Sequence, residues 1–270
     1  MKAILLSLSA LTLTNPSSAT LYCPASKDLN LDYGAVSLSD DGGWSIGSGG
    51  GRVSSKASFN LLGGMISFTM DVSNVADAVN TNFYTSSPSV ANTGSESYCD
   101  IQLDPGCMEL DIIENNGQCG YATTLHTFPT DGKEGCTACD RWGCMTSGFL
   151  PSNKIFDVKA EFSDSGDVIV SINGNTNSNY SPYPSSDSNQ VVVKTMESIG
   201  AVIESSMWSG WVPPVDGSCP SGEGNGLNNS LLKVTNVKVE GTVVQGPEPS
   251  KCAEYFGDEM SNLRGAVLNK

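Results

Sequence analysis

The chain has 270 residues, a formal net charge of −15, a single histidine and 29 glycines. A strongly acidic protein is repelled by nucleic acid and by anionic membrane surfaces, so neither is expected as a partner. No stretch of the chain reaches the roughly 20 apolar residues of a membrane helix, and abundant glycine with few basic residues is typical of short strands joined by polar turns.

Residues 1–19 have the features of a secretory signal, with a basic residue at Lys2, an apolar stretch over residues 3–13 and small residues before a cleavage point. We therefore expect a secreted, extracellular protein, most simply a monomer. Residues 20–246 are expected to form one domain. Residues 247–270 are expected to form a C-terminal tail, with one short helix beginning near Asp258.

Strand-like stretches follow one another along the chain and are separated mostly by Gly, Asn, Ser or Asp. Ile155–Phe162 and Val168–Ile172, joined by a polar turn, are predicted to form a hairpin. Val191–Thr195 is interpreted as a strand, and no helix is predicted before the tail. The pattern predicts an all-β fold, an antiparallel β-sandwich or concanavalin-like jelly roll with a concave cleft. The other predicted strands are Met65–Val72, Met108–Ile113, Thr123–Phe128, Ala201–Ser205 and Leu231–Val244.

Nine cysteines behind an export signal indicate disulfides, and the odd number leaves one that is free or pairs between chains. The spacing of Cys136, Cys139 and Cys144 superficially suggests zinc. Because the chain has only one histidine, disulfides are the favoured interpretation. We expect no metal and no cofactor, and the pairing of the cysteines stays open at this point.

Three carboxylates fall within six residues of a predicted strand, in Glu109-Leu110-Asp111-Ile112-Ile113-Glu114. Charged side chains are almost never buried without partners. Glu109 and Asp111 share a face because side chains alternate along a strand. A β-bulge at Ile112-Ile113 would turn Glu114 to that face and direct both isoleucines into the core. The trio suits glycosidic acid/base and nucleophilic chemistry, whereas an ordinary solvated strand face is the simpler alternative.

The acidic segment resembles the Glu-x-Asp-x-x-Glu signature of the jelly-roll glycosidases of families 7 and 16, and His126 resembles the histidine that follows it. Residues 98–102, Tyr-Cys-Asp-Ile-Gln, resemble a family 7 segment beside the nucleophile. Ser206-Met207-Trp208 resembles a further family 7 strand. The chain is shorter than family 7 domains, which implies that the loops roofing a tunnel are largely missing. Ile113 also stands where that family has Trp.

The resemblance implies that Glu109 is the nucleophile, Asp111 its electrostatic partner and Glu114 the acid/base of a retaining hydrolase. Trp208 is the favoured sugar-stacking tryptophan, because it lies where a strand gives way to a Gly/Pro-rich loop. The residues expected at the substrate are His126, Asp100, Gln102, Tyr98 and Trp208.

The expected function is hydrolysis of a β-glucan with retention of configuration, through a glycosyl-enzyme. Missing tunnel loops favour endo action, on β-1,4-glucan by the family 7 likeness or on β-1,3/mixed-linkage glucan by the family 16 likeness. Transfer to a sugar instead of water would use the same residues. Two other classes stay open: a lectin-like or effector protein with the same fold and no turnover, and a disulfide-rich wall protein.

Overall fold

The computed structural model describes residues 19–40, 42–88, 107–127, 139, 142–176, 186–221 and 226–252. Within these ranges the chain forms 13 strands and one α-helix, and every strand pairing is antiparallel. The elements are β1 (Thr20–Tyr22), β2 (Leu29–Leu38), β3 (Trp44–Ser55), β4 (Ser58–Asn74), β5 (Val79–Ser86), β6 (Glu109–Asn116), β7 (Gly120–His126), β8 (Cys144–Phe149), β9 (Ile155–Phe162), β10 (Val168–Ile172), β11 (Asn175–Thr176), α1 (Ser186–Ser198), β12 (Val202–Ser209) and β13 (Leu231–Gln245).

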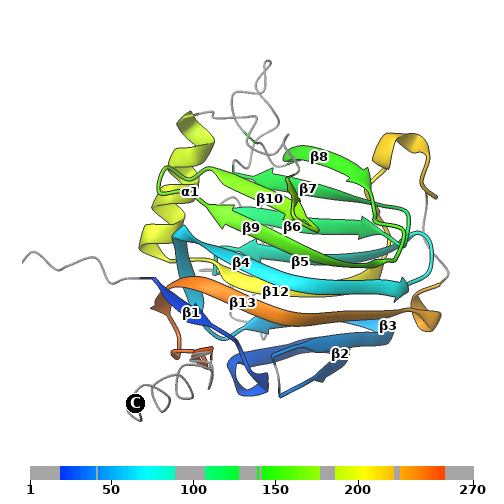
Figure 1. Ribbon diagram of the computed structural model, residues 1–270, viewed down its shortest axis with the longest axis horizontal. Coiled ribbons are helices and arrows are strands. Elements are labelled where there is room, and N and C mark those ends of the chain that lie inside the picture. Colours follow the sequence, from blue (N-terminus) through cyan, green and yellow to red (C-terminus); the bar gives the residue numbers. More distant parts are fainter. Residues whose placement is uncertain are drawn as a thin grey trace, which may run out of the picture.

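One curled sheet contains all of these strands, in the order β11-β10-β9-β4-β13-β3-β12-β5-β6-β7-β8, with β2 beside β3 and β1 beside β13. Strand β13 joins the two halves, because it pairs with β4 along its length and with β3 near its start. Figure 1 shows β9 and β10 crossing over β6 and β7, so the halves form two layers. The predicted all-β sandwich is confirmed.

The core lies between the layers, and one face of each layer supplies it. Along β9, residues 155–162 alternate between exposed and buried, as expected for a strand with one wet face. Across the core, the rings of Phe68 from β4 and Phe83 from β5 stack with their centroids 3.8 Å apart. The other face of the β3-β12-β5-β6-β7-β8 layer, which we call the outer face of the back layer, points away from this core.

The predicted hairpin is confirmed, since β9 and β10 pair from Phe162 opposite Val168 onwards. The prediction of a strand over Val191–Thr195 is wrong, because these residues lie inside α1. Three consecutive β-branched valines favour a strand locally. Burial of Val192 and Met196, four positions apart, shows that packing of one helical face against the sheet outweighed that preference.

The two ends of the described chain meet. Tyr22 in β1 forms a bridge with Lys251, and Cys23 is joined to Cys252 by a disulfide. Residues 247–252 of the expected tail therefore pack against the body of the domain. The helix expected near Asp258 lies outside the described residues. Across the part of the chain that the structure describes, no helix is long and apolar enough to cross a membrane.

Candidate active site

The acidic strand β6 contains the predicted bulge. Opposite β7, Asp111 pairs with Thr124 and Glu114 pairs with Ala122, so three steps on β6 match two steps on β7. Opposite β5, the same extra residue shifts the register between Asp111 and Ile113. Ile112 and Ile113 are both fully buried in the core. The bulge prediction is confirmed, and its consequence is that Glu114 points to the same face as Asp111.

The three acids share the outer face of the back layer. Residues directly opposite each other on antiparallel strands project to the same side of the sheet. Asp111 lies opposite Tyr84 and Glu114 opposite Asn82, two positions away on β5, while Glu109 lies opposite Ser86, two positions away on the other side. Although this face is turned from the core, the exposed fractions of Glu109, Asp111 and Glu114 are only 7%, 8% and 8%. The trio is therefore recessed, and its charges are poorly screened by water.

Glu114 has the environment of a proton donor. Its Oε1 accepts a hydrogen bond of 2.8 Å from Nδ2 of Asn80 on β5. Burial raises the pKa of Glu114 to about 8, and the neighbouring charge of Asp111 acts in the same direction, while the Asn80 bond opposes them. A carboxyl with this pKa stays protonated at neutral pH, as a general acid must be.

We predict that Asn80→Ala moves the basic limb of the pH profile of glucan hydrolysis to higher pH. A general acid works only while protonated, so with Glu114 in its expected role activity should fall as the pH rises through the pKa of Glu114. The Asn80 bond lowers that pKa, and its loss raises it further. The profile of kcat/KM against pH gives the shift.

The matched control for this substitution is Asn116→Ala. Asn80 and Asn116 both tie the loop after β12 to the sheet, through Trp211 O and through Pro213 O and Pro220 O respectively. Only Asn80 bonds Glu114. The basic limb of Asn116→Ala should therefore coincide with that of the wild type. A basic limb that moves equally in both variants would show that the loop, not the amide, controls Glu114.

His126 contacts Asp111. It ends β7 opposite Glu109, and its Nε2 lies 3.3 Å from Asp111 Oδ2. The backbone of Gly143 lies against the imidazole: a Cβ built there would lie 2.7 Å from His126 Cε1 and 2.2 Å from Thr124 Cγ2, at a φ of +81°. Only glycine fits this close approach without displacing the ring. The close approach of Gly143 and the contact with Asp111 thus both constrain the position of the histidine.

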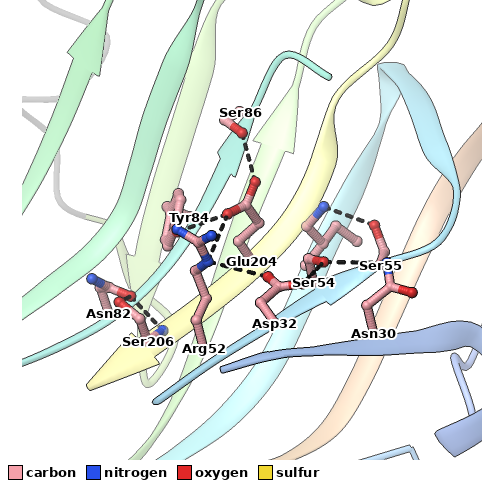
Figure 2. Close-up of polar contacts among 11 residues, drawn as sticks. Asn30, Asp32, Arg52, Ser54, Ser55, Asn82, Tyr84, Ser86, Glu204 and Ser206 are labelled. Atoms are coloured by element: carbon pink, nitrogen blue, oxygen red, sulfur yellow. Dashed lines mark hydrogen bonds and ion pairs between the residues drawn. The ribbon is translucent and has the colours of Figure 1, made fainter. Parts of the chain in front are cut away.

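A polar network on the same face as the acid trio crosses β5, β12, β3 and β2 (Figure 2). Glu204 on β12 accepts hydrogen bonds of 2.7 Å from the Tyr84 and Ser86 hydroxyls. On its other side, Arg52 Nε lies 4.0 Å from Glu204 Oε2 and 3.1 Å from Asp32 Oδ2. Because Tyr84 also lies opposite Asp111, the network and the trio occupy one continuous face.

Glu204 is fully buried, and burial raises its pKa to about 7 despite the two hydroxyl donors and Arg52. The folded state therefore holds this proton more tightly than the unfolded state, in which the pKa is near 4.5. Protonation of Glu204 therefore stabilises the folded state, and this contribution to the free energy of unfolding is fully present below pH 4.5. It is lost as the pH rises from 4.5 to about 7, and above that range it no longer changes with pH.

We predict that Glu204→Gln loses less stability than the wild type between pH 4.5 and 7.5, by roughly 3 kcal/mol at most. Glutamine keeps the shape and an acceptor oxygen but has no proton to lose. Urea unfolding at several pH values measures the difference. The contribution of Glu114 is common to both proteins and cancels in the comparison. Parallel stability curves would contradict the raised pKa.

Trp208, near the end of β12, and Trp211, in the loop that follows, have different surroundings. Trp208 is partly buried on the outer face, opposite Asn80, and its ring contacts Gly210. Trp211 is 53% exposed, on a loop that Cys119–Cys219 ties to the turn after β6. The disulfide thereby joins the loop that carries Trp211 to the end of the acidic strand. Cys139 and Cys144, two of the three cysteines whose spacing superficially suggested a zinc site, form a disulfide with each other.

Several expected site residues, Tyr98, Asp100 and Gln102, lie outside the described residues. The fold also brings to this face residues that no sequence motif singled out. A signal for one group was present: Asn80, Asn82, Tyr84 and Ser86 stand at every second position, so a strand over this segment would place them on one face. For Glu204 the signal was a lone acid inside a predicted strand. The residues missed are Asp32, Arg52, Asn80, Asn82, Tyr84, Ser86 and Glu204.

No family profile matches the chain, and no curated protein matches it. Solved structures do. An endo-1,3-β-glucanase from Streptomyces sioyaensis has a TM-score of 0.54 at 14% identity, over 87% of this chain and 99% of its own. The chain has the fold of this glucanase. The endocellulase EGI of Humicola insolens matches with a TM-score of 0.54 at 16% identity, over 75% of this chain and 77% of its own.

A family 7 cellobiohydrolase from Daphnia pulex also matches, with a TM-score of 0.52 at 14% identity, over 75% of this chain and 78% of its own. The neighbours thus include a 1,3-β-glucanase, an endocellulase and a family 7 cellobiohydrolase. The resemblance that the acidic signature suggested is confirmed at the level of the fold.

Proposed function

We propose that the protein is a secreted, endo-acting β-glucan hydrolase that retains the anomeric configuration. The observation that carries the proposal is the bulge in β6, which places Glu114 on the face of Glu109 and Asp111. The glucanase fold of the structural neighbours supports the substrate class. Disulfides among the described residues support secretion.

In the proposed reaction, Glu109 attacks the anomeric carbon while Glu114 gives its proton to the departing glycosidic oxygen. Because Asn80 bonds Oε1 of Glu114, that oxygen acts as the acceptor and Oε2 carries the proton. Asp111, held by His126, keeps negative charge between the two glutamates and favours the protonated form of Glu114. Water activated by the resulting Glu114 carboxylate then releases the sugar from Glu109.

The test is a product profile on defined β-1,3-, β-1,4- and mixed-linkage glucan oligosaccharides, followed by NMR from the first seconds of reaction. We expect internal cleavage of one of these series, with the β-anomer appearing first. The α-anomer appearing first would show inversion, which needs a wider separation of the carboxyls. Tight binding of an oligosaccharide without any turnover would instead establish the lectin-like alternative.

A further inference from the structure

A disulfide that closes a very short loop lies beside the histidine that contacts the acids. Cys139 and Cys144 are joined at a sequence separation of 5, whereas Cys23 and Cys252 are joined at a separation of 229. The entropy that a cross-link removes from the unfolded chain grows with the length of the loop that it closes. Cys139–Cys144 therefore contributes less to global stability by this route than Cys23–Cys252, and its main effect is expected in the structure around it.

Cys139 is anchored by a closed set of buried hydrogen bonds. Its carbonyl oxygen accepts bonds from the backbone N–H of Thr127 at 3.0 Å and from Thr127 Oγ1 at 2.8 Å, while its own N–H donates to Ser188 Oγ at 2.9 Å. The two hydroxyl oxygens lie 2.8 Å apart. Since the one proton of the Thr127 hydroxyl goes to Cys139, Ser188 donates to Thr127. Cys139 is thus tied both to the residue after His126 and to the first turn of α1.

Gly143 lies just beyond the strand pairing that could hold it in place. Among the described strands, β8 pairs with β7 alone, at the edge of the sheet (Figure 1), and this pairing ends with Cys144 opposite Leu125. Gly143 precedes that last pair. The ends of an edge strand open more readily than the interior of a sheet, because they depend on one neighbour. The disulfide supplies a second attachment, from Cys144 to the anchored Cys139.

The imidazole of His126 is packed between Gly143 and the acidic strand. A Cβ built on Gly143 would lie 2.7 Å from Cε1 and 2.9 Å from Nδ1, so the backbone of Gly143 leaves no room beside this edge of the ring. On another edge, Nε2 lies 3.3 Å from Asp111 Oδ2. In a closely packed interior, movement of one group gives its neighbour room to move. A displacement of Gly143 would therefore let the imidazole leave Asp111.

We infer that the Cys139–Cys144 disulfide is a positioning element of the active site. It fixes Gly143, Gly143 fixes His126, and His126 is thereby kept against Asp111, the central acid of the trio. The disulfide acts on the acids only through the histidine. Its effect on turnover rests on the proposed function, whereas its effect on the imidazole does not. The two effects are therefore measured separately.

The test is the double variant Cys139→Ser/Cys144→Ser, followed by NMR of the imidazole. Because His126 is the only histidine of the chain, protein made without a histidine tag gives a single Cε1–H signal. We expect this signal to move towards the position of free histidine. We also expect kcat on the glucan to fall about ten- to a hundredfold, the scale of displacing active-site groups by about 1 Å. The control Cys23→Ser/Cys252→Ser should lower the melting temperature more and leave the signal in place.

Gly143→Ala tests the same contact with the disulfide intact, and decides the matter if the double variant does not fold. Its added methyl group meets the imidazole, so the same signal should move. Gly174→Ala is the matched control, because Gly174 has a similar φ of +73° and no atom within 4 Å of a built Cβ. It should leave the signal and kcat unchanged.

A histidine signal that keeps its wild-type position in Gly143→Ala and in the folded double variant would overturn the inference. A signal that moves in both variants without any loss of turnover would equally remove the link from the disulfide to the acids. Failure of the proposed function has a separate signature: the wild type would cleave no glucan, while the position of the histidine signal would still report the contact with Gly143.

Discussion

Replacement of Glu109 by glutamine is expected to lower turnover of the confirmed glucan at least about a hundredfold, because a neutral amide does not form the glycosyl-enzyme. Glutamine matches glutamate in size, and Glu109 lies opposite Ser86 and His126 in two strand pairings that do not depend on its charge. The fold should therefore be preserved. Reducing-sugar release under saturating substrate measures the loss, and circular dichroism verifies folding.

The control is Glu161→Gln, which removes an exposed glutamate of β9 that pairs only with Lys159 among the described residues. Its activity should equal that of the wild type. A fluorinated glucoside that traps glycosyl-enzymes should add its sugar mass to the wild type and to Glu161→Gln, but not to Glu109→Gln. A folded Glu109→Gln protein that turns over within tenfold of the wild type would remove Glu109 from the mechanism.

Replacement of Glu114 by alanine is expected to lower glucan hydrolysis about 10²–10⁴-fold, the usual range for loss of a general acid. Because a sugar alkoxide needs a proton to depart and an acidic phenol does not, the loss should be far smaller on an activated aryl glycoside. On that substrate, the glycosyl-enzyme should then accumulate, since no base activates water. Added azide, which needs no base, should restore turnover.

The comparison of substrates distinguishes this role from a structural one. Damage to the fold would lower turnover of all substrates alike and would not respond to azide. Asp111→Asn gives a second comparison, because Asp111 helps to raise the pKa of Glu114 and contacts His126. It should move the basic limb to lower pH, the direction opposite to Asn80→Ala. If Glu114→Ala lost the same factor in turnover on the glucan and on the activated aryl glycoside, Glu114 would not be the general acid.

Local sequence determined the acidic strand and its register. Three acids interleaved with Leu110, Ile112 and Ile113 have only one arrangement that buries the apolar side chains and keeps the acids together, and that arrangement requires the bulge. The hairpin of β9 and β10 is similarly local, because five residues join its strands. Both could be predicted since their energetics depend on neighbours in the chain.

Only the tertiary structure decided the surroundings of the acids. Glu204 and Tyr84 are 120 residues apart, and Asn80 and Glu114 are 34 apart. Their contacts follow from strand pairings that no local pattern specifies. Helix α1 illustrates the same limit, since its valines favour a strand until packing of one face against the sheet is included. The sequence by itself placed the carboxylates on one strand. The pairing of distant strands decided the raised pKa of Glu114, the partners of the carboxylates and the face on which they lie.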